Sequence, residues 1–170
     1  MVGSIAVLTL FFGTNDSVME GYKQHVPLDD FKAKMKEMLQ YLLSIGLANE
    51  KIVIITPPRV NETAWEKECK RHLGHPKNKT NEITSKYAEV CCHLGQAFHI
   101  DVLDLFNVML REQNWERFLL SDGIHLSVDG AKLLHQHLLP IVLKKTSHLP
   151  TRFPLWRDVD DMHPENSLLQ

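Results

Sequence analysis

Residues 5–12 read Ile-Ala-Val-Leu-Thr-Leu-Phe-Phe, and Gly13 follows them directly. The run shows no alternation of apolar and polar residues, and it is rich in β-branched and aromatic side chains. A short, continuously apolar segment that ends at a glycine is typical of a strand buried on both faces of a parallel sheet. Residues 5–12 therefore predict the first strand of an α/β fold.

Two further strands and three helices are predicted along the chain. Residues 52–56 form a second apolar run that stops at two prolines, and residues 101–105 form a third, shorter one. Apolar residues at three- and four-residue spacings predict amphipathic helices, which cover residues 28–45, 83–98 and 127–142. Ser127 is placed to cap the last of them. The order β-α-β-α-β-α predicts a parallel sheet with helices on both faces.

The remaining segments are polar or irregular. Residues 59–80 mix lysines and arginines with glutamates, which predicts a solvated, partly helical excursion rather than a binding patch. Residues 1–150 are expected to form one domain. Residues 151–170 are expected to form an irregular tail that packs on this domain through Phe153 and Trp156.

Composition excludes several classes of protein. The chain of 170 residues carries 19 Lys plus Arg against 21 Asp plus Glu, a net charge of −2 that argues against nucleic-acid binding. The longest apolar run, residues 5–12, is far shorter than the roughly 20 residues of a membrane-spanning helix. Without a recognisable signal peptide, a cytoplasmic protein with reduced cysteines is expected.

Two polar clusters follow predicted strands, where ligands gather in open α/β sheets. The first is Gly13-Thr14-Asn15-Asp16. Its glycine permits close backbone approach, and the Asn15 amide can donate a hydrogen bond to a developing oxyanion. Glycine, asparagine and aspartate are also the ordinary residues of any turn at a strand exit.

The second cluster is Ser121-Asp122-Gly123-Ile124-His125, directly before the last helix. An acid three residues before a histidine, with a glycine between them, can fold back in a short loop. The Asp122 carboxylate would then hold the imidazole Nδ1–H, and Nε2 would be free to act as a general base. A chance histidine beside an ordinary Asp-Gly turn is the alternative.

Together, and in this order, the two clusters resemble the SGNH hydrolases, the GDSL-type esterases and lipases. That family places Gly-x-Asn-Asp after its third strand and Asp-x-x-His before its last helix. The resemblance implies a flavodoxin-like three-layer fold, hydrolysis of a small carboxylic ester, and no metal or organic cofactor. It extends to the flanking sequence, namely to residues 11–17, 55–57, 62–65, 119–127 and 156–159.

The resemblance also implies roles for individual residues. His125 would be the general base and Asp122 its orienting acid. Asn15 would donate to the oxyanion hole, Gly13 would let the backbone approach the substrate, and Asp16 would brace the turn. Trp65 and Phe118 are candidate lining residues of the acyl pocket.

The family's nucleophilic serine lies in a Gly-Asp-Ser motif after its first strand, and no such motif occurs in these 170 residues. Residues 1–150 would therefore be a partial domain that starts just before the family's third strand and lacks the first two. Ser17 is the best internal substitute, but it adjoins the oxyanion motif, so one loop would have to supply both functions. The chain alone is expected to be inactive.

Without the family's first strand, the strand at residues 5–12 would become an edge that invites a complementing strand or self-association. One alternative function is therefore a truncated, non-catalytic isoform that acts by binding. Another is a zinc-binding domain, although the spacing matches no usual zinc-finger pattern. Its candidate ligands would be Cys69, His72, His75, Cys91, Cys92 and His93.

Overall fold

The structure is a computed structural model that describes residues 5–149 and 156–167. Three strands, β1 (Leu8–Phe11), β2 (Ile52–Ile55) and β3 (Asp101–Leu103), form a sheet in the order β1-β2-β3. Both strand pairs are parallel, with Leu8 opposite Ile52 and Val53 opposite Asp101. The predicted parallel α/β fold is therefore confirmed.

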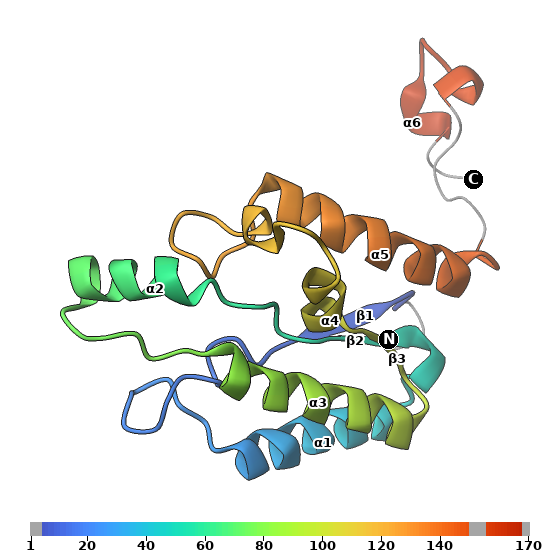
Figure 1. The fold of residues 1–170 in the computed structure, drawn as a ribbon. Coiled ribbons are helices and arrows are strands. Elements are labelled where there is room, and N and C mark those ends of the chain that lie inside the picture. The colour runs from blue at the N-terminus through green and yellow to red at the C-terminus, as the bar shows by residue number, and fades with distance from the viewer. Residues whose placement is uncertain (1–4, 150–155, 168–170) are drawn as a thin grey trace.

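Four helices cover the two faces of the sheet (Figure 1). Helices α1 (Leu28–Ser44) and α3 (Asn81–Phe98) lie on one face, and α4 (Leu105–Leu110) and α5 (Val128–Thr146) lie on the other. The strand β2 is buried along its whole length, because its alternate side chains enter the two cores. Ile52 and Ile54 pack with α1 and α3, and Val53 and Ile55 pack with α4 and α5.

The remaining elements connect or follow these layers. They are η2 (Asn49–Lys51), α2 (Glu62–Glu68), η3 (Cys69–Leu73), η4 (Trp115–Phe118), η5 (Trp156–Asp158) and α6 (Pro164–Ser167). Helix α2 and the π-helical turn η3 form an arm at one end of the sheet (Figure 1). This is the end at which the strands β1 and β2 lead into their polar loops, so the arm stands beside the candidate site.

The helix starts follow the sequence signals. Ser127 caps α5 as expected, because its Oγ accepts a hydrogen bond of 3.1 Å from the Gly130 N–H. Thr80 caps α3 in the same way through the Ile83 N–H at 3.3 Å. These bonds satisfy backbone donors that have no partner within the helix, and each stabilises it by about 1 kcal/mol.

The first strand differs from the prediction. It spans four residues rather than eight, and only Leu10 of these is buried. Phe11 is 38% exposed and Phe12 is 47% exposed. The reason is that β1 pairs with β2 alone among the described residues, so its second edge and part of its surface are uncovered.

The expected packing of the tail is wrong for Trp156, whose side chain is 87% exposed. Phe153, the other expected contact, lies outside the described residues. In the part of the chain that the structure describes, no helix is long and apolar enough to cross a membrane.

Candidate active site

The loop that follows β1 is held in a fixed shape by its own hydrogen bonds. Gly13 has a φ of +107°, and a Cβ there would lie 3.1 Å from Pro57 Cγ, so the position favours glycine. The Gly13 N–H donates to Asp16 Oδ2 at 3.1 Å, which agrees with the expected bracing role of Asp16. The Ser17 N–H donates to Gly13 O at 3.0 Å. The Gly13 N–H is therefore engaged, whereas the Asn15 amide belongs to an exposed residue and lines the pocket.

The second loop, residues 119–127, is closed by a short antiparallel bridge between Leu119 and Leu126. The Leu120 N–H donates to His125 O at 2.7 Å, which brings the two sides of the loop together. Gly123, with φ +80°, packs against the start of α2, and a Cβ there would lie 2.6 Å from Asn61 O. This contact fixes the loop beside the arm.

Asp122 and His125 form the expected pair. His125 Nδ1 lies 2.6 Å from Asp122 Oδ2, and Asp122 Oδ1 accepts the N–H groups of Ile124 at 2.9 Å and His125 at 3.1 Å. Burial acts to raise the pKa of the Asp122 carboxyl, but these hydrogen bonds outweigh it and hold the pKa below its ordinary value. Asp122 is therefore ionised at neutral pH and accepts the Nδ1–H. The imidazole itself is exposed, with Nε2 available to a reacting group.

Replacing Asp122 with asparagine should change the tautomer of His125. An ionised carboxylate can only accept at Nδ1, whereas an amide can donate there, so the D122N variant should lose its preference for the Nδ1–H form. The ¹⁵N chemical shifts of the neutral imidazole measure this directly. D129N, at an exposed acid that pairs with Lys132 in α5, should leave them unchanged. An unaltered tautomer in D122N would contradict the assigned orientation.

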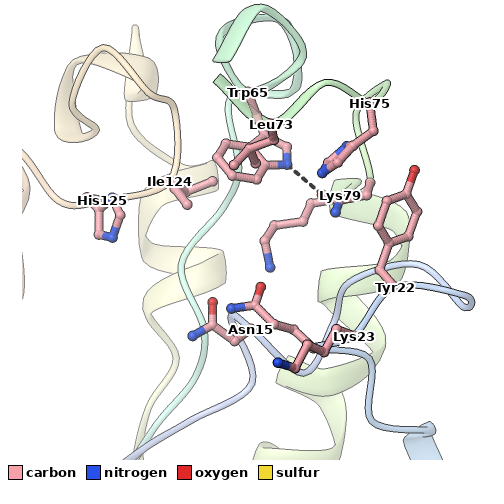
Figure 2. Close-up of a pocket in the computed structure, with 11 residues that line it drawn as sticks. Asn15, Tyr22, Lys23, Trp65, Leu73, His75, Lys79, Ile124 and His125 are labelled. Atoms are coloured by element: carbon pink, nitrogen blue, oxygen red, sulfur yellow. Dashed lines mark hydrogen bonds between the residues drawn. The ribbon is translucent and has the colours of Figure 1, made fainter. Parts of the chain in front are cut away.

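A pocket of about 570 Å³ joins the two loops. Figure 2 shows Asn15 and His125 on the same side of this pocket, one from each cluster singled out in the sequence. Trp65, the suggested lining residue, forms part of the wall. Phe118 does not, since it is 4% exposed and packs in the core between α4, η4 and α5. The other lining residues are Tyr22, Lys23, Gln24, Leu73, His75, Asn78, Lys79 and Ile124.

The prediction that residues 59–80 form only a solvated excursion is wrong for its two ends. Trp65 is 8% exposed and donates from Nε1 to Asn78 Oδ1 at 2.9 Å. Lys79 is 1% exposed, and its Nζ donates to Thr14 O at 2.5 Å. The segment therefore folds back on itself between Trp65 and Asn78, and Lys79 joins it to the first loop. Sequence reasoning missed Lys79, because nothing distinguishes it from the other lysines of this charged segment.

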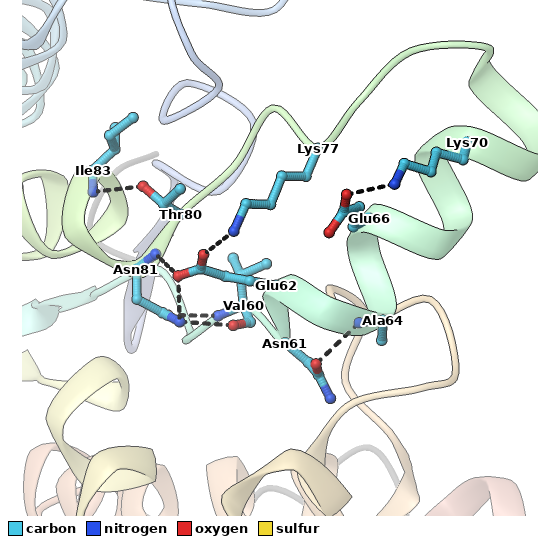
Figure 3. A network of polar contacts seen from close by, with 10 residues as sticks. All are labelled: Val60, Asn61, Glu62, Ala64, Glu66, Lys70, Lys77, Thr80, Asn81 and Ile83. Atoms are coloured by element: carbon cyan, nitrogen blue, oxygen red, sulfur yellow. Dashed lines mark hydrogen bonds and ion pairs between the residues drawn. The ribbon is translucent and has the colours of Figure 1, made fainter.

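A polar network fixes this arm to helix α3 (Figure 3). Glu62 at the start of α2 accepts the Asn81 N–H at 2.9 Å and the Lys77 ammonium at 2.7 Å. Asn81 in turn bonds the backbone of Val60 at 2.9 and 2.8 Å. Burial acts to raise the pKa of Glu62, but the hydrogen bonds from Lys77 and Asn81 outweigh it and lower the pKa. The wall that carries Trp65 is therefore held at its base by a charged, hydrogen-bonded anchor.

Ser17 has no access to this pocket. It is fully buried, and its Oγ donates to Thr14 O at 3.2 Å and lies 3.3 Å from Thr84 Oγ1. In the described residues, no serine hydroxyl forms a hydrogen bond with His125, whose only side-chain partner is Asp122. Among residues 5–149 and 156–167, the imidazole Nε2 therefore has no serine hydroxyl as a hydrogen-bond partner.

The zinc hypothesis gains no support from the geometry. Within residues 5–149 and 156–167, no group of three or more His, Cys, Asp or Glu side chains is arranged to hold a metal ion. Cys69 is fully buried, whereas His72 lies 3.8 Å from Glu68 on an exposed surface. The three cysteines Cys69, Cys91 and Cys92 are free thiols.

The Asp122–His125 pair and the Asn15 amide lie at the loop end of a parallel sheet that helices cover on both faces, which defines a three-layer α/β protein with an acid–base pair at its pocket. Comparison with known proteins is more specific. The chain belongs to the GDSL-like lipase/acylhydrolase family, whose model matches residues 4–133. Both loops of the site fall within the matched region.

Several curated relatives match almost the whole chain. The isoamyl acetate-hydrolyzing esterase 1 homolog of Homo sapiens is 43% identical over 164 residues, which cover 95% of this chain and 65% of the relative. A GDSL esterase/lipase of Arabidopsis thaliana is 31% identical and covers 96% of this chain and 70% of its own length. The chain thus spans about two thirds of the length of these relatives.

Solved structures share the fold. A lipase/acylhydrolase from Enterococcus faecalis superposes with a TM-score of 0.63 over 86% of this chain and 64% of its own length, at 22% identity. An acetylxylan esterase from Geobacillus stearothermophilus gives a TM-score of 0.56 over 79% of this chain and 57% of its own, at 18% identity. These similarities support the three-layer architecture independently of the sequence relatives.

Proposed function

We propose that this chain supplies the proton-transfer and oxyanion-binding part of a carboxylester hydrolase that acts on a small ester. The observation that carries the proposal is the Asp122–His125 pair, 2.6 Å apart, opening into one pocket with the Asn15 amide. The relatives named for ester hydrolysis support the reaction class. A pocket of about 570 Å³ is of the size that small-molecule sites have.

The roles follow from the chemistry of acyl transfer. A serine hydroxyl attacks the ester carbonyl while His125 Nε2 accepts its proton, and Asp122 stabilises the resulting imidazolium. Asn15 Nδ2 donates to the oxyanion of the tetrahedral intermediate. The intermediate collapses and expels the alcohol, which takes the proton from His125. Water then repeats the sequence on the acyl-serine and releases the carboxylic acid.

In this proposal the serine comes from a segment outside these 170 residues. Ser17, the internal candidate, is buried and engaged with Thr14 and Thr84. The 170-residue chain by itself therefore has the base and the oxyanion donor but not the attacking group. Fluorophosphonate labelling tests this point, because the reagent modifies only an activated serine. Stoichiometric labelling of the pure chain would overturn it.

The open edge of β1 accepts a further strand in the working protein. Its unpaired backbone groups and the exposed side chains of Phe11 and Phe12 form the surface that such a strand would cover. Sedimentation velocity tests this: the isolated chain should self-associate with rising concentration, and a serine-bearing segment supplied in trans should reverse the association. A chain that stays monomeric and melts cooperatively on its own would contradict the role of this edge.

The same open edge favours the second candidate function, that of a non-catalytic isoform that binds a partner chain through β1. Recovery of ester hydrolysis with the supplied segment distinguishes the two candidates. A complex that forms without any gain in hydrolysis would favour the binding role.

A further inference from the structure

The candidate pocket has a one-sided charge distribution. Its lining includes two lysines and two histidines, and no aspartate or glutamate of the described residues lines it. These cationic and titratable groups are Lys23, Lys79, His75 and His125. A pocket for an uncharged ester has no need of two ammonium groups, and burial of one of them costs free energy unless it acquires a partner.

Lys79 is the buried member of this set. Its side chain is 1% exposed, and Figure 2 shows its ammonium directed towards Asn15 across the pocket. The ammonium carries three donors, but Thr14 O is its one hydrogen-bond acceptor among the described residues. Two donors are therefore left for a ligand. The nearest acid, Asp16, is on the first loop, where its carboxylate accepts the Gly13 N–H.

We infer that the pocket takes esters that also carry a carboxylate, and that the Lys79 ammonium binds this carboxylate. The inference rests on the proposed esterase function and specifies its substrate class. Because the ammonium lies towards Asn15, the carboxylate must be only a few atoms from the ester carbonyl that Asn15 holds. Half-esters of short dicarboxylic acids have this arrangement. Lys23, an exposed residue of the lining, adds a second positive charge to the pocket.

The electrostatics of Lys79 agree with this assignment. Desolvation by burial lowers the pKa of Lys79 to about 8, although nearby Asp16 acts in the opposite direction. A bound carboxylate would restore the charge interaction that water no longer supplies. Anion affinity should therefore fall as the pH rises through 8 and the ammonium loses its proton. The titratable groups around Lys79 are Asp16, Cys69, Tyr22, Lys23, His75 and His125.

NMR titration of the 170-residue chain tests the inference without any need for turnover. The probes are monomethyl succinate, the uncharged dimethyl succinate and butyrate, followed at the indole N–H of Trp65. Monomethyl succinate should bind at least about tenfold more tightly than the other two. Equal binding of the diester would overturn the inference. Equal binding of butyrate would also overturn it, because the site would then recognise a carboxylate without any contribution from the ester group.

Lysine variants test whether Lys79 is the residue that binds the carboxylate. K79M should lose roughly tenfold or more in affinity for monomethyl succinate and nothing for the diester. K70M, at an exposed lysine paired with Glu66, is the matched control and should bind normally. If K79M does not fold, K23M and the loss of affinity between pH 7 and pH 10 decide instead. Undiminished binding in K23M together with a flat pH profile would overturn the inference.

The same data separate this inference from the proposed function. Half-ester binding that depends on Lys79, combined with no hydrolysis after a serine is supplied, would refute the esterase and leave the carboxylate site. Hydrolysis of neutral esters with no preference for half-esters would refute the carboxylate site and leave the esterase.

Discussion

Ester turnover should rise by a factor on the order of 10⁶ when a serine-bearing segment is joined to this chain, because removal of the nucleophile from a triad costs about that much. The segment can be taken from the part of the human relative that this chain does not match, since the chain covers 65% of that protein. Hydrolysis of a chromogenic acetate ester, before and after the addition, measures the change.

Variants of the completed enzyme test each assigned role. H125A should return turnover to the level of the isolated chain, because His125 is the imidazole of this pocket that Asp122 orients to accept the serine proton. D122N should lower kcat by about 10⁴ through the wrong tautomer. N15A should lower kcat by about 10² to 10³ through the lost oxyanion donor. The exposed D129N variant should be fully active. A completed enzyme that is unaffected by H125A would refute the assigned base.

A G130A substitution should destabilise the fold by about 3 kcal/mol, at the upper end of what overpacking costs. Gly130 lies in the first turn of α5 against the backbone of η4, and a Cβ there would lie 2.0 Å from Phe118 O. Backbone cannot rotate away as a side chain does, so α5 must shift. The shift would disturb the Ser127 hydroxyl, which donates to Arg117 O at 2.7 Å.

Thermal unfolding measures this effect, and the melting temperature should fall by about 6 to 12 °C for a chain of this size. G74A is the matched control, because Gly74 has a φ of +71° but nothing within 4 Å of the position that a Cβ would take. It should cost only about 1 to 2 kcal/mol through backbone strain. Equal losses of stability in the two variants would show that backbone conformation, and not the contact with Phe118, causes the destabilisation in G130A. The G130A variant should also lower the activity of the completed enzyme, since the Asp122–His125 loop directly precedes α5.

Features that depend on residues close together in the chain could be predicted from the amino-acid sequence. The three strands, the Ser127 cap and the Asp122–His125 pair are of this kind, because apolar runs, capping hydroxyls and a three-residue separation act within one or two turns of backbone. The residues of both loops were therefore predictable. The chemical role of these loops was harder to predict, since an Asp-Gly turn beside a histidine also occurs without any function.

Which of these loops and side chains come into contact depends on how the whole chain folds. Parallel pairing of β1 and β2 brings the loops that follow these two strands to one end of the sheet. The loop after β1 carries Asn15, and the chain after β2 carries Asn61. Gly123 packs against Asn61, so the loop that carries His125 is held at the same end and shares the pocket with Asn15. Lys79 became part of the site through a hydrogen bond to Thr14, 65 positions away. Burial, and with it the pKa of a side chain, depends on such distant neighbours, and no local pattern of residues encodes it.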